Sequence, residues 1–357
     1  MEPIWALGCM SGTSMDGVDG ALVRTDGETV FAFGPRHFIP FAPEEREVLV
    51  AAQGCWPGES NALAAAGEVI HRAHVALAQA LPGADVIGFH GQTLAHDPAE
   101  GRTHQLGDGP RLARETGLTV VHDFRSADMR AGGQGAPLAP IFHHAAARAA
   151  GLRVPVAFLN LGGVGNITWL DPRERPEAML AFDTGPANAL LDDFVEQRTR
   201  EPQDTDGALA AAGRAHLDLI AGIGEQYLST PPPKSLDRHD FHAAMSTVEG
   251  LSTEDGAATL AALTVRTVAA GLKHLPSPPM RWLVCGGGRH NPTLMAGLRE
   301  ALPGLVDPVE AVGLDGDLLE AQAFGHLAAR VIRGLPTSYP GTTGCAVPVS
   351  GGQIARP

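Results

Sequence analysis

The 357-residue sequence contains few aromatic and few charged side chains. Aromatic residues make up 5% and charged residues 18% of the chain, whereas hydrophobic residues make up 44%. This share of hydrophobic residues is sufficient for globular cores and disfavours disorder over most of the length. With so few aromatic residues, we expect cores built mainly from Ala, Leu and Val. The length exceeds that of a single core and predicts two domains.

The sequence also lacks a long hydrophobic run and any clustering of cysteine. No segment approaches the roughly 20 apolar residues that span a bilayer. The start "MEPIWALGCM" has no basic region of the kind that opens a signal peptide. Cys9, Cys55, Cys285 and Cys345 are scattered without a C-x-x-C pair, which argues against a zinc site or a redox motif. We therefore expect a cytoplasmic protein with reduced thiols and no membrane partner.

Positive charge is scarce relative to negative charge. The 26 Lys and Arg residues stand against 40 Asp and Glu residues, which gives a net charge of -14 at pH 7. Such a field repels nucleic acid and anionic membranes, so neither is an expected partner. An anionic ligand would need local compensation from a metal ion, arginines or backbone N–H groups.

Strand and helix patterns alternate along the chain, which is typical of an α/β architecture. "PIWALGCM" and "GALVRT" predict a strand hairpin, and "VPVAFLNLGGVGNITWL" predicts a second hairpin with a glycine turn. One such hairpin opening each half indicates a duplicated architecture. We divide the chain into an N-terminal domain, 1–135, and a C-terminal domain, 136–334, with the option that the tail, about 335–357, packs back on the first.

Three glycine turns each follow an apolar strand: Gly12 to Gly17, Gly162 to Asn166, and Gly286 to Gly288. Successive glycines let backbone N–H groups point into one concavity, which can bind phosphate without a lysine. Each turn alone could equally join two strands for steric reasons. The absence of G-x-x-x-x-G-K-[ST] excludes a P-loop, and no G-x-G-x-x-G opens a helix after the first strand, so a Rossmann site is unsupported.

Asp183, in "AFDTGP", follows an apolar strand and precedes a predicted helix. This position can present a carboxylate as a general base, and a helix N-cap is the alternative. The same D-T-G occurs in aspartic proteases. A second D-[ST]-G is missing, however, and the alanine-rich helical composition does not suit an all-β protease.

Six short motifs occur in a specific order: "MSGTSMDGVD", "HGQT", "RAGGQGAPLAP", "NLGGVGNIT", "FDTGPAN" and "CGGGRHN". In combination, from about Leu7 to Arg333, they resemble the anhydro-N-acetylmuramic acid kinases of bacteria. The resemblance implies an α/β fold in which two similar actin/hexokinase-like (ribonuclease H-like) domains face a central cleft. It also implies a reaction. ATP and a small anhydro-amino-sugar are the substrates. The 1,6-anhydro bond of N-acetylmuramic acid is opened by water and the freed 6-oxygen is phosphorylated.

The resemblance assigns residues to the ATP site and to catalysis. The phosphate loop comprises Gly12, Thr13, Ser14, Met15, Asp16, Gly17, Val18 and Asp19, and further ATP contacts fall on Gly162, Gly163, Asn166, Gly286, Gly287, Gly288 and Asn291. A carboxylate beside polyphosphate repels it unless a metal lies between them. Asp16 and Asp19 are therefore expected to hold Mg²⁺ through water, and capping of the hairpin turn is the alternative. Asp183 is the expected catalytic base.

Substrate contacts are expected from His90, Gln92, Thr93, Arg125, Arg130, Asn160 and Glu320. Arg125 or Arg130 would neutralise the lactyl carboxylate, with surface salt bridges as the alternative. A hydrogen-bonded core histidine is the alternative for His90, and a solvated helix face is the alternative for Glu320. The resemblance further implies a homodimer. Two other functions remain open: a kinase of the same fold for another sugar or carboxylate, and an actin- or Hsp70-like ATPase module.

Overall fold

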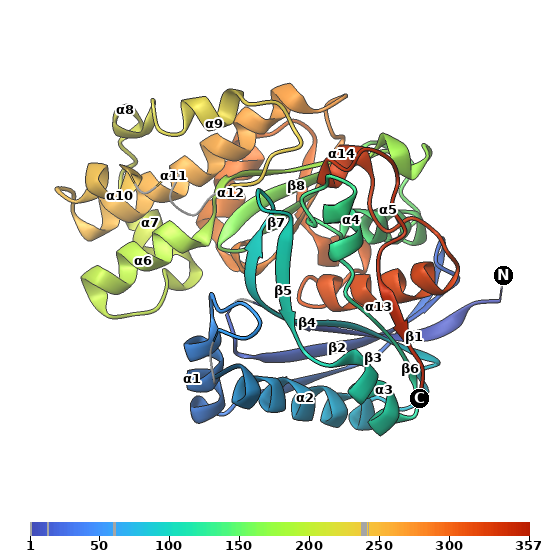
Figure 1. Ribbon diagram of the computed structural model, residues 1–357. Helices are drawn as coiled ribbons and strands as arrows, with labels where there is room; N and C mark the ends of the chain where they lie inside the picture. The colour runs from blue at the N-terminus through green and yellow to red at the C-terminus, as the bar shows by residue number, and fades with distance from the viewer. Residues whose placement is uncertain (1, 13, 60–61, 237–240, 242) are drawn as a thin grey trace. The chain divides into compact units, whose positions relative to one another are not determined.

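The computed structural model describes residues 2–12, 14–59, 62–236, 241 and 243–357 (Figure 1). Two compact units divide the chain: Met1–Leu152 together with Leu318–Pro357, and Arg153–Asp317. These units differ from the predicted domains in the placement of two helices. Helix α5 (Pro140–Ala149) and helix α13 (Leu319–Ile332) belong to the first unit.

The first unit contains a seven-stranded mixed sheet. Its strands are β1 (Ile4–Ser11), β2 (Gly17–Thr25), β3 (Val30–Pro40), β4 (Val86–Asp97), β5 (Arg102–Leu106), β6 (Thr119–His122) and β12 (Gln353–Ala355). The order is β12-β6-β4-β1-β2-β3, with β5 paired to β4. Strands β1, β2 and β3 are antiparallel, whereas β1, β4 and β6 run parallel. Because β12 pairs with β6, the end of the chain completes this sheet.

Helices cover both faces of the first sheet. They are α1 (Pro43–Ala52), α2 (Ala62–Ala80), α3 (Gly109–Thr116), α4 (Ser126–Arg130), α5, α13 and α14 (Pro340–Thr343). The apolar stripe of α2 packs into the core, and a Cβ at Gly20 would meet Leu77 of this helix. On the other face α13 lies directly against the strands, because a Cβ at Gly8 would lie 1.7 Å from the carbonyl oxygen of Ala321 (Figure 1).

The second unit repeats the strand pattern of the first. Its strands are β7 (Val156–Leu161), β8 (Val164–Leu170), β9 (Leu180–Pro186), β10 (Arg281–Cys285) and β11 (Leu305–Pro308), in the order β11-β10-β7-β8-β9. Three antiparallel strands are followed by two strands parallel to the first of them. The same order, β3-β2-β1-β4-β6, occurs in the first unit, which confirms the duplicated α/β, ribonuclease H-like fold.

Helices of the second unit pack on its sheet and on one another. They are α6 (Asn188–Thr199), α7 (Ala208–Ala212), α8 (Leu217–Ile220), α9 (Glu225–Ser229), α10 (Ala243–Val248), α11 (Thr253–Gly271) and α12 (Pro292–Ala301). The short 3₁₀ helices η1 (Pro176–Ala178), η2 (Thr205–Gly207), η3 (Leu272–His274), η4 (Gly287–His290) and η5 (Val309–Val312) connect them. Helix α11 contacts the sheet where Gly271 meets Phe182 and Ile167.

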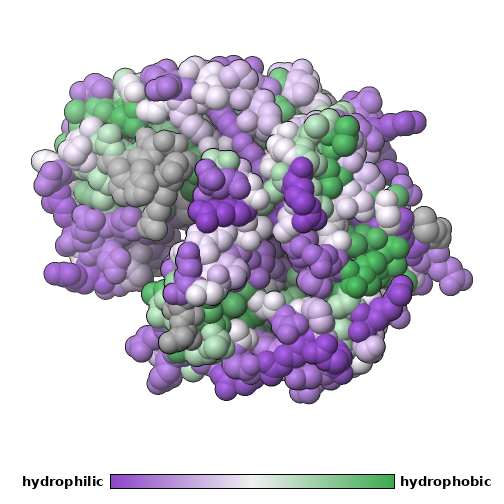
Figure 2. Space-filling view, viewed as in Figure 1, coloured by the Kyte–Doolittle hydropathy of each residue, from purple (hydrophilic) through white to green (hydrophobic). Residues whose placement is uncertain are grey.

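The outer surface of α2 and α3 is polar, as the lower part of Figure 2 shows. Arg111 of α3 bonds Glu68 of α2 and Glu115 of its own helix. Among the residues that the structure describes, no helix is both long and apolar enough to cross a membrane.

Candidate functional site

The first glycine turn joins β1 to β2 and is only partly available to a ligand. Met15 has a left-handed backbone (φ 52°), and the side chains of Met15 and Val18 are buried in the core, at 1% and 0% exposure. These two residues can therefore offer a ligand only their backbone groups. The carboxylate of Asp16 is exposed and accepts a hydrogen bond from Ser14 Oγ at 2.9 Å. Thr13 lies outside the described residues.

Gln92 holds this turn in place through side-chain hydrogen bonds. Its side chain is fully buried, with Nε2 donating to the Gly12 carbonyl at 3.1 Å and Oε1 lying 2.6 Å from Ser11 Oγ. Ser11 Oγ is also 3.0 Å from the carbonyl of Gly17. The neighbouring Thr93 donates to Gln105 at 2.7 Å. The polar atoms of Gln92 and the hydroxyl of Thr93 are thus engaged within the protein, and a substrate contact by either residue stays a prediction.

In the first unit the buried His90 is hydrogen-bonded to the partly exposed Arg125. Arg125 donates to His90 Nε2 at 2.8 Å, and arginine can only donate, so His90 carries its proton on Nδ1 and donates it to the Gly91 carbonyl at 2.8 Å. Burial and the nearby Arg125 charge hold the pKa of His90 well below its usual range. The histidine is neutral, and the centre of its ring lies 4.5 Å from the centre of the Phe324 ring.

The Arg125 guanidinium also donates to the Gly135 carbonyl at 2.8 Å. Burial lowers the pKa of Arg125 to about 10, against the opposing charges of Glu320 and Asp128. Glu320, in the first turn of α13, has an exposed side chain. Glu320 and Arg125 thus interact through their opposite charges. Arg130 is exposed to solvent.

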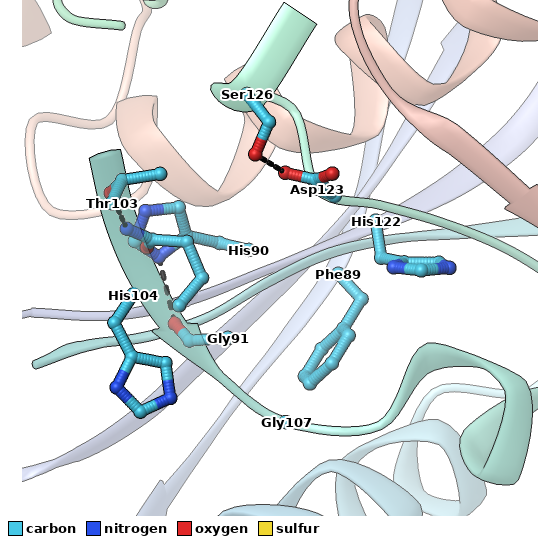
Figure 3. Close-up of a pocket in the computed structure, with 10 residues that line it drawn as sticks. Phe89, His90, Gly91, Thr103, His104, Gly107, His122, Asp123 and Ser126 are labelled. Atoms are coloured by element: carbon cyan, nitrogen blue, oxygen red, sulfur yellow. Dashed lines mark hydrogen bonds between the residues drawn. The ribbon is translucent and has the colours of Figure 1, made fainter. Parts of the chain in front are cut away.

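A pocket opens beside His90, lined by residues from the middle of β4, from β5 and from the carboxyl end of β6 (Figure 3). The empty space inside it, including the part that is open to solvent, is about 500 Å³. Asp123, which has a left-handed backbone (φ 51°), accepts hydrogen bonds from Ser126 and Gln353 at one wall. Apart from His90, the residues that line this pocket were not predicted as site residues. Asp123 and Ser126, polar residues that come just after the apolar strand β6, were the available signal.

Three predicted site residues of the second unit lie in one row across its sheet. Asn160 pairs with Asn166, and Asn166 pairs with Asp183. Directly opposed residues project from the same face of a sheet, so the two amides and the carboxylate share one face. A Cβ at Gly162 or Gly163 would meet no heavy atom closer than 3.5 Å. Packing therefore does not require glycine at this turn, and the turn has room for a ligand.

The third glycine turn packs closely on the same hairpin. Gly286 has a left-handed backbone (φ 73°), and a Cβ there would lie 2.3 Å from Asn160 Oδ1. A Cβ at Gly288 would lie 2.6 Å from Leu161, whereas one at Gly287 would meet only Asn188, at 3.7 Å. Asn291 caps α12, since its Oδ1 accepts from the N–H groups of residues 293 and 294. The acceptor of Asn291 is therefore already used.

Asp183 is held on β9 by three hydrogen bonds. Its Oδ2 accepts from the Leu236 N–H at 2.9 Å, its N–H donates to the Lys234 carbonyl at 3.1 Å, and its carbonyl accepts from the Tyr227 hydroxyl at 2.7 Å. Burial raises the pKa of Asp183 to about 6, and the Leu236 N–H opposes this increase. Helix α6 has Ala187 at its N-cap, so Asp183 does not cap it. A carboxylate with a pKa near neutrality is suited to general-base chemistry.

Comparison with known proteins decides the family. The family model for anhydro-N-acetylmuramic acid kinase matches residues 4–357. The chain belongs to the anhydro-N-acetylmuramic acid kinase family.

The family's curated members are similar over nearly their whole length. The kinase of this name from Cereibacter sphaeroides is 55% identical, over 99% of this chain and 96% of its own. The protein from Jannaschia sp. named anhydro-N-acetylmuramic acid kinase 1 is 54% identical over the same shares. The family resemblance inferred from the motifs is thereby confirmed.

The solved structures that are similar to this chain are far more distant. The activator of 2-hydroxyisocaproyl-CoA dehydratase from Clostridium difficile, with bound ADPNP, is 12% identical with a TM-score of 0.43, over 93% of this chain and 96% of that one. A ROK family glucokinase from Streptomyces griseus, in complex with glucose and AMPPNP, is 12% identical with a TM-score of 0.43, over 91% and 99%.

The first glycine turn carries two carboxylates, a donor type that a water-mediated magnesium ion could use. Asp16 is exposed and Asp19 is half-buried, and carboxylate oxygens are the ligands that Mg²⁺ prefers. Within the described parts of the chain, no group of three or more His, Cys, Asp or Glu could enclose a metal. Magnesium usually keeps several waters and is shared with substrate phosphates, which agrees with this donor set.

Proposed function

We propose that this chain is an ATP-dependent kinase that opens 1,6-anhydro-N-acetylmuramic acid with water and phosphorylates its 6-oxygen. The product is N-acetylmuramic acid 6-phosphate, formed in peptidoglycan recycling. Membership of the family over residues 4–357 supports this activity. The structural observation that carries it is the Asp183 carboxylate, with a pKa of about 6, in one row with Asn160 and Asn166.

In the proposed reaction Asp183 accepts the proton of the attacking water. The water oxygen bonds the anomeric carbon, and the bond between that carbon and the 6-oxygen breaks. The freed 6-oxygen then bonds the γ-phosphorus of ATP, and ADP leaves. The sum is one water and one phosphoryl group added to the sugar, with the proton passing from Asp183 to solvent. A base near neutral pKa can both take up and release this proton at pH 7.

We propose that ATP is bound by backbone N–H groups of the Gly12 to Asp19 turn and of the Gly162–Gly163 turn. The glycines with open surroundings, Gly12, Gly162 and Gly163, support this assignment. Mg²⁺ held through water by Asp16 and Asp19 would, when bound, neutralise phosphate charge. The Gly286 to Gly288 turn and Asn291 would border the adenosine.

For the sugar we propose contacts from Arg125, Glu320 and Asn160. His90, with both ring nitrogens engaged, would act by holding Arg125 in place. Arg125 is the stronger candidate for the lactyl carboxylate, because two hydrogen bonds hold its guanidinium and it is only partly exposed. A pre-organised guanidinium binds a carboxylate with little further loss of freedom. Arg130 is exposed and is the weaker candidate.

We further propose a cytoplasmic homodimer. The four cysteines all lie in the described part of the chain and form no disulfide, which agrees with a reducing compartment. Strand β3 lies at a sheet edge and exposes Phe31, Phe33 and Phe38, which is a surface suited to a second copy. Light scattering on the purified protein would measure the mass of the assembly.

The deciding experiment incubates the protein with ATP, Mg²⁺ and the anhydro-sugar and measures the product by mass spectrometry. We expect a product heavier than the sugar by one water and one phosphoryl group. The Asp183→Asn variant should bind ATP and give no product. Near-normal turnover in this variant would refute the role of Asp183. ATP consumption with other sugars, and none with the anhydro-sugar, would refute the substrate.

A further inference from the structure

Lys234 is one of only two lysines in the chain, and its side chain is buried, at 8% exposure. Its ammonium group donates to the Tyr227 carbonyl at 2.8 Å and lies 3.4 Å from the Leu228 carbonyl. It also lies 4.5 Å from the centre of the Tyr227 ring and 5.8 Å from that of Phe182. A buried charge is costly unless it is hydrogen-bonded, so these contacts fix the side chain.

The segment that Lys234 ties down is the one that holds Asp183. The Lys234 carbonyl accepts from the Asp183 N–H, and two residues later the Leu236 N–H donates to Asp183 Oδ2. Tyr227, whose carbonyl binds the ammonium, donates its hydroxyl to the Asp183 carbonyl. One connected set of hydrogen bonds therefore links the ammonium to the backbone and the carboxylate of Asp183.

We propose that Lys234 is a positioning residue for the catalytic base. Its ammonium holds the segment 234–236 against the end of α9. This contact keeps the Leu236 N–H within hydrogen-bonding distance of Asp183 Oδ2. This inference rests on the proposed function, because it takes Asp183 to be the catalytic base. The N–H favours the charged carboxylate and aims one of its oxygens, which leaves the other for the water.

The other titratable groups of this cluster are Tyr227, His274 and Lys273. His274 Nε2 lies 2.9 Å from the Leu228 carbonyl that Lys234 also approaches. Burial and the Lys273 charge lower the pKa of Lys234 to about 8. A pH profile of activity alone would combine these groups with Asp183, so the carboxyl itself must be observed.

The test compares Lys234→Met with Lys273→Met, a matched control because Lys273 is the other lysine, lies in the same unit and is exposed. We expect Lys234→Met to lower kcat roughly ten- to hundredfold, the range typical of lost supporting contacts at a site. The KM for ATP should stay within about twofold. The Lys273→Met variant should retain the wild-type kcat.

The second readout needs no activity. Carbon-13 NMR of aspartate-labelled protein gives the Asp183 carboxyl signal, which is identified by its loss in Asp183→Asn. Because the lost Leu236 N–H had favoured the charged form, the midpoint of this titration should rise in Lys234→Met and stay unchanged in Lys273→Met. In the pH profile of kcat/KM, the midpoint of the acid limb should rise with the Asp183 titration midpoint in Lys234→Met.

Chemical rescue separates positioning from folding. In Lys234→Ala the space can admit water to the two carbonyls, and added propylammonium should restore part of kcat and the original Asp183 titration. A folded Lys234→Met with wild-type kcat and titration would overturn the proposal, as would failure of both variants to fold. Full turnover by Asp183→Asn would instead refute the base, and the dependence of the Asp183 titration on Lys234 would still be measurable.

Discussion

At the scale of single residues, Asp183 shows how burial adjusts a common side chain to a catalytic task. An exposed aspartate would be a weak base at pH 7. Burial on β9 raises its pKa to about 6, and the Leu236 N–H limits the rise. The same burial makes the charged form unfavourable for folding.

Asp183→Asn is therefore expected to stabilise the protein as it abolishes turnover. The pKa of Asp183 is raised in the folded state, so folding favours the protonated carboxyl, and this contribution is lost as pH rises through about 6. The variant should gain roughly 1–3 kcal/mol of unfolding free energy at pH 8 and little at pH 4. Denaturant unfolding at the two pH values measures this. An equal change at both would contradict the prediction.

Gln92 shows a second effect at this scale, the support of one motif by another. Its amide joins "HGQT" to the first glycine turn, 80 positions away. In Gln92→Ala two buried hydrogen bonds are lost, so that the Gly12 carbonyl keeps only the Met15 N–H and the Ser11 hydroxyl keeps only the Gly17 carbonyl. The expected loss is about 1–3 kcal/mol of stability, together with weaker ATP binding. Thermal unfolding and calorimetric titration with ATP measure the two effects, and Thr93→Val, which removes one hydroxyl nearby, is the control.

At the scale of elements, the glycines fall into two groups with different functions. Gly8 permits α13 to approach β1, since a Cβ there would overlap the Ala321 carbonyl. Gly12, a few residues later, has its nearest neighbour for a Cβ at 3.6 Å. Composition alone cannot separate these two glycines, because the difference lies in what the chain brings beside them.

This contrast predicts opposite outcomes for two alanine substitutions. Gly8→Ala should destabilise the protein by more than about 3 kcal/mol or prevent folding, because backbone atoms of α13 cannot move away without separating the helix from the sheet. Gly12→Ala should change stability by less than about 1 kcal/mol and weaken ATP binding. Urea unfolding and ATP titration of both variants provide the comparison. Normal ATP binding by Gly12→Ala would remove this glycine from the phosphate site.

At the scale of the whole molecule, the strand order β3-β2-β1-β4-β6 of the first unit recurs as β9-β8-β7-β10-β11. Each unit thus presents a glycine hairpin between its first two strands. The net charge of -14 makes a bare nucleotide an unfavourable ligand for the molecule as a whole. A metal ion reduces this repulsion.

ATP should therefore stabilise the protein only together with Mg²⁺. At a hundredfold excess over the dissociation constant, the linkage gives about 2.7 kcal/mol of added unfolding free energy. Chelation of the metal with EDTA should abolish most of it, and Asp16→Asn combined with Asp19→Asn should do the same in the presence of Mg²⁺. Thermal unfolding detects these shifts. Full stabilisation by ATP in EDTA would refute a required metal.

The sequence by itself determined the family, the duplicated strand pattern and the position of Asp183 at a strand end. These follow from local patterns: apolar runs, glycine turns and the order of six motifs. The tertiary structure decided which unit each helix joins. Helix α13 packs with the first unit because Gly8, Gly88 and Gly325, far apart along the chain, allow backbone contact between sheet and helix. Helix α5 in turn contacts α13, where the rings of Phe142 and His326 meet.

Tertiary contacts also decided the roles of several predicted site residues. The side chains of Met15 and Val18 are in the core, Gln92 supports a turn and Asn291 caps a helix. A sequence motif shows only which residue types occur together along the chain. Whether a side chain points to a ligand or into the protein depends on neighbours from distant parts of the chain, and only the folded structure brings those neighbours into contact.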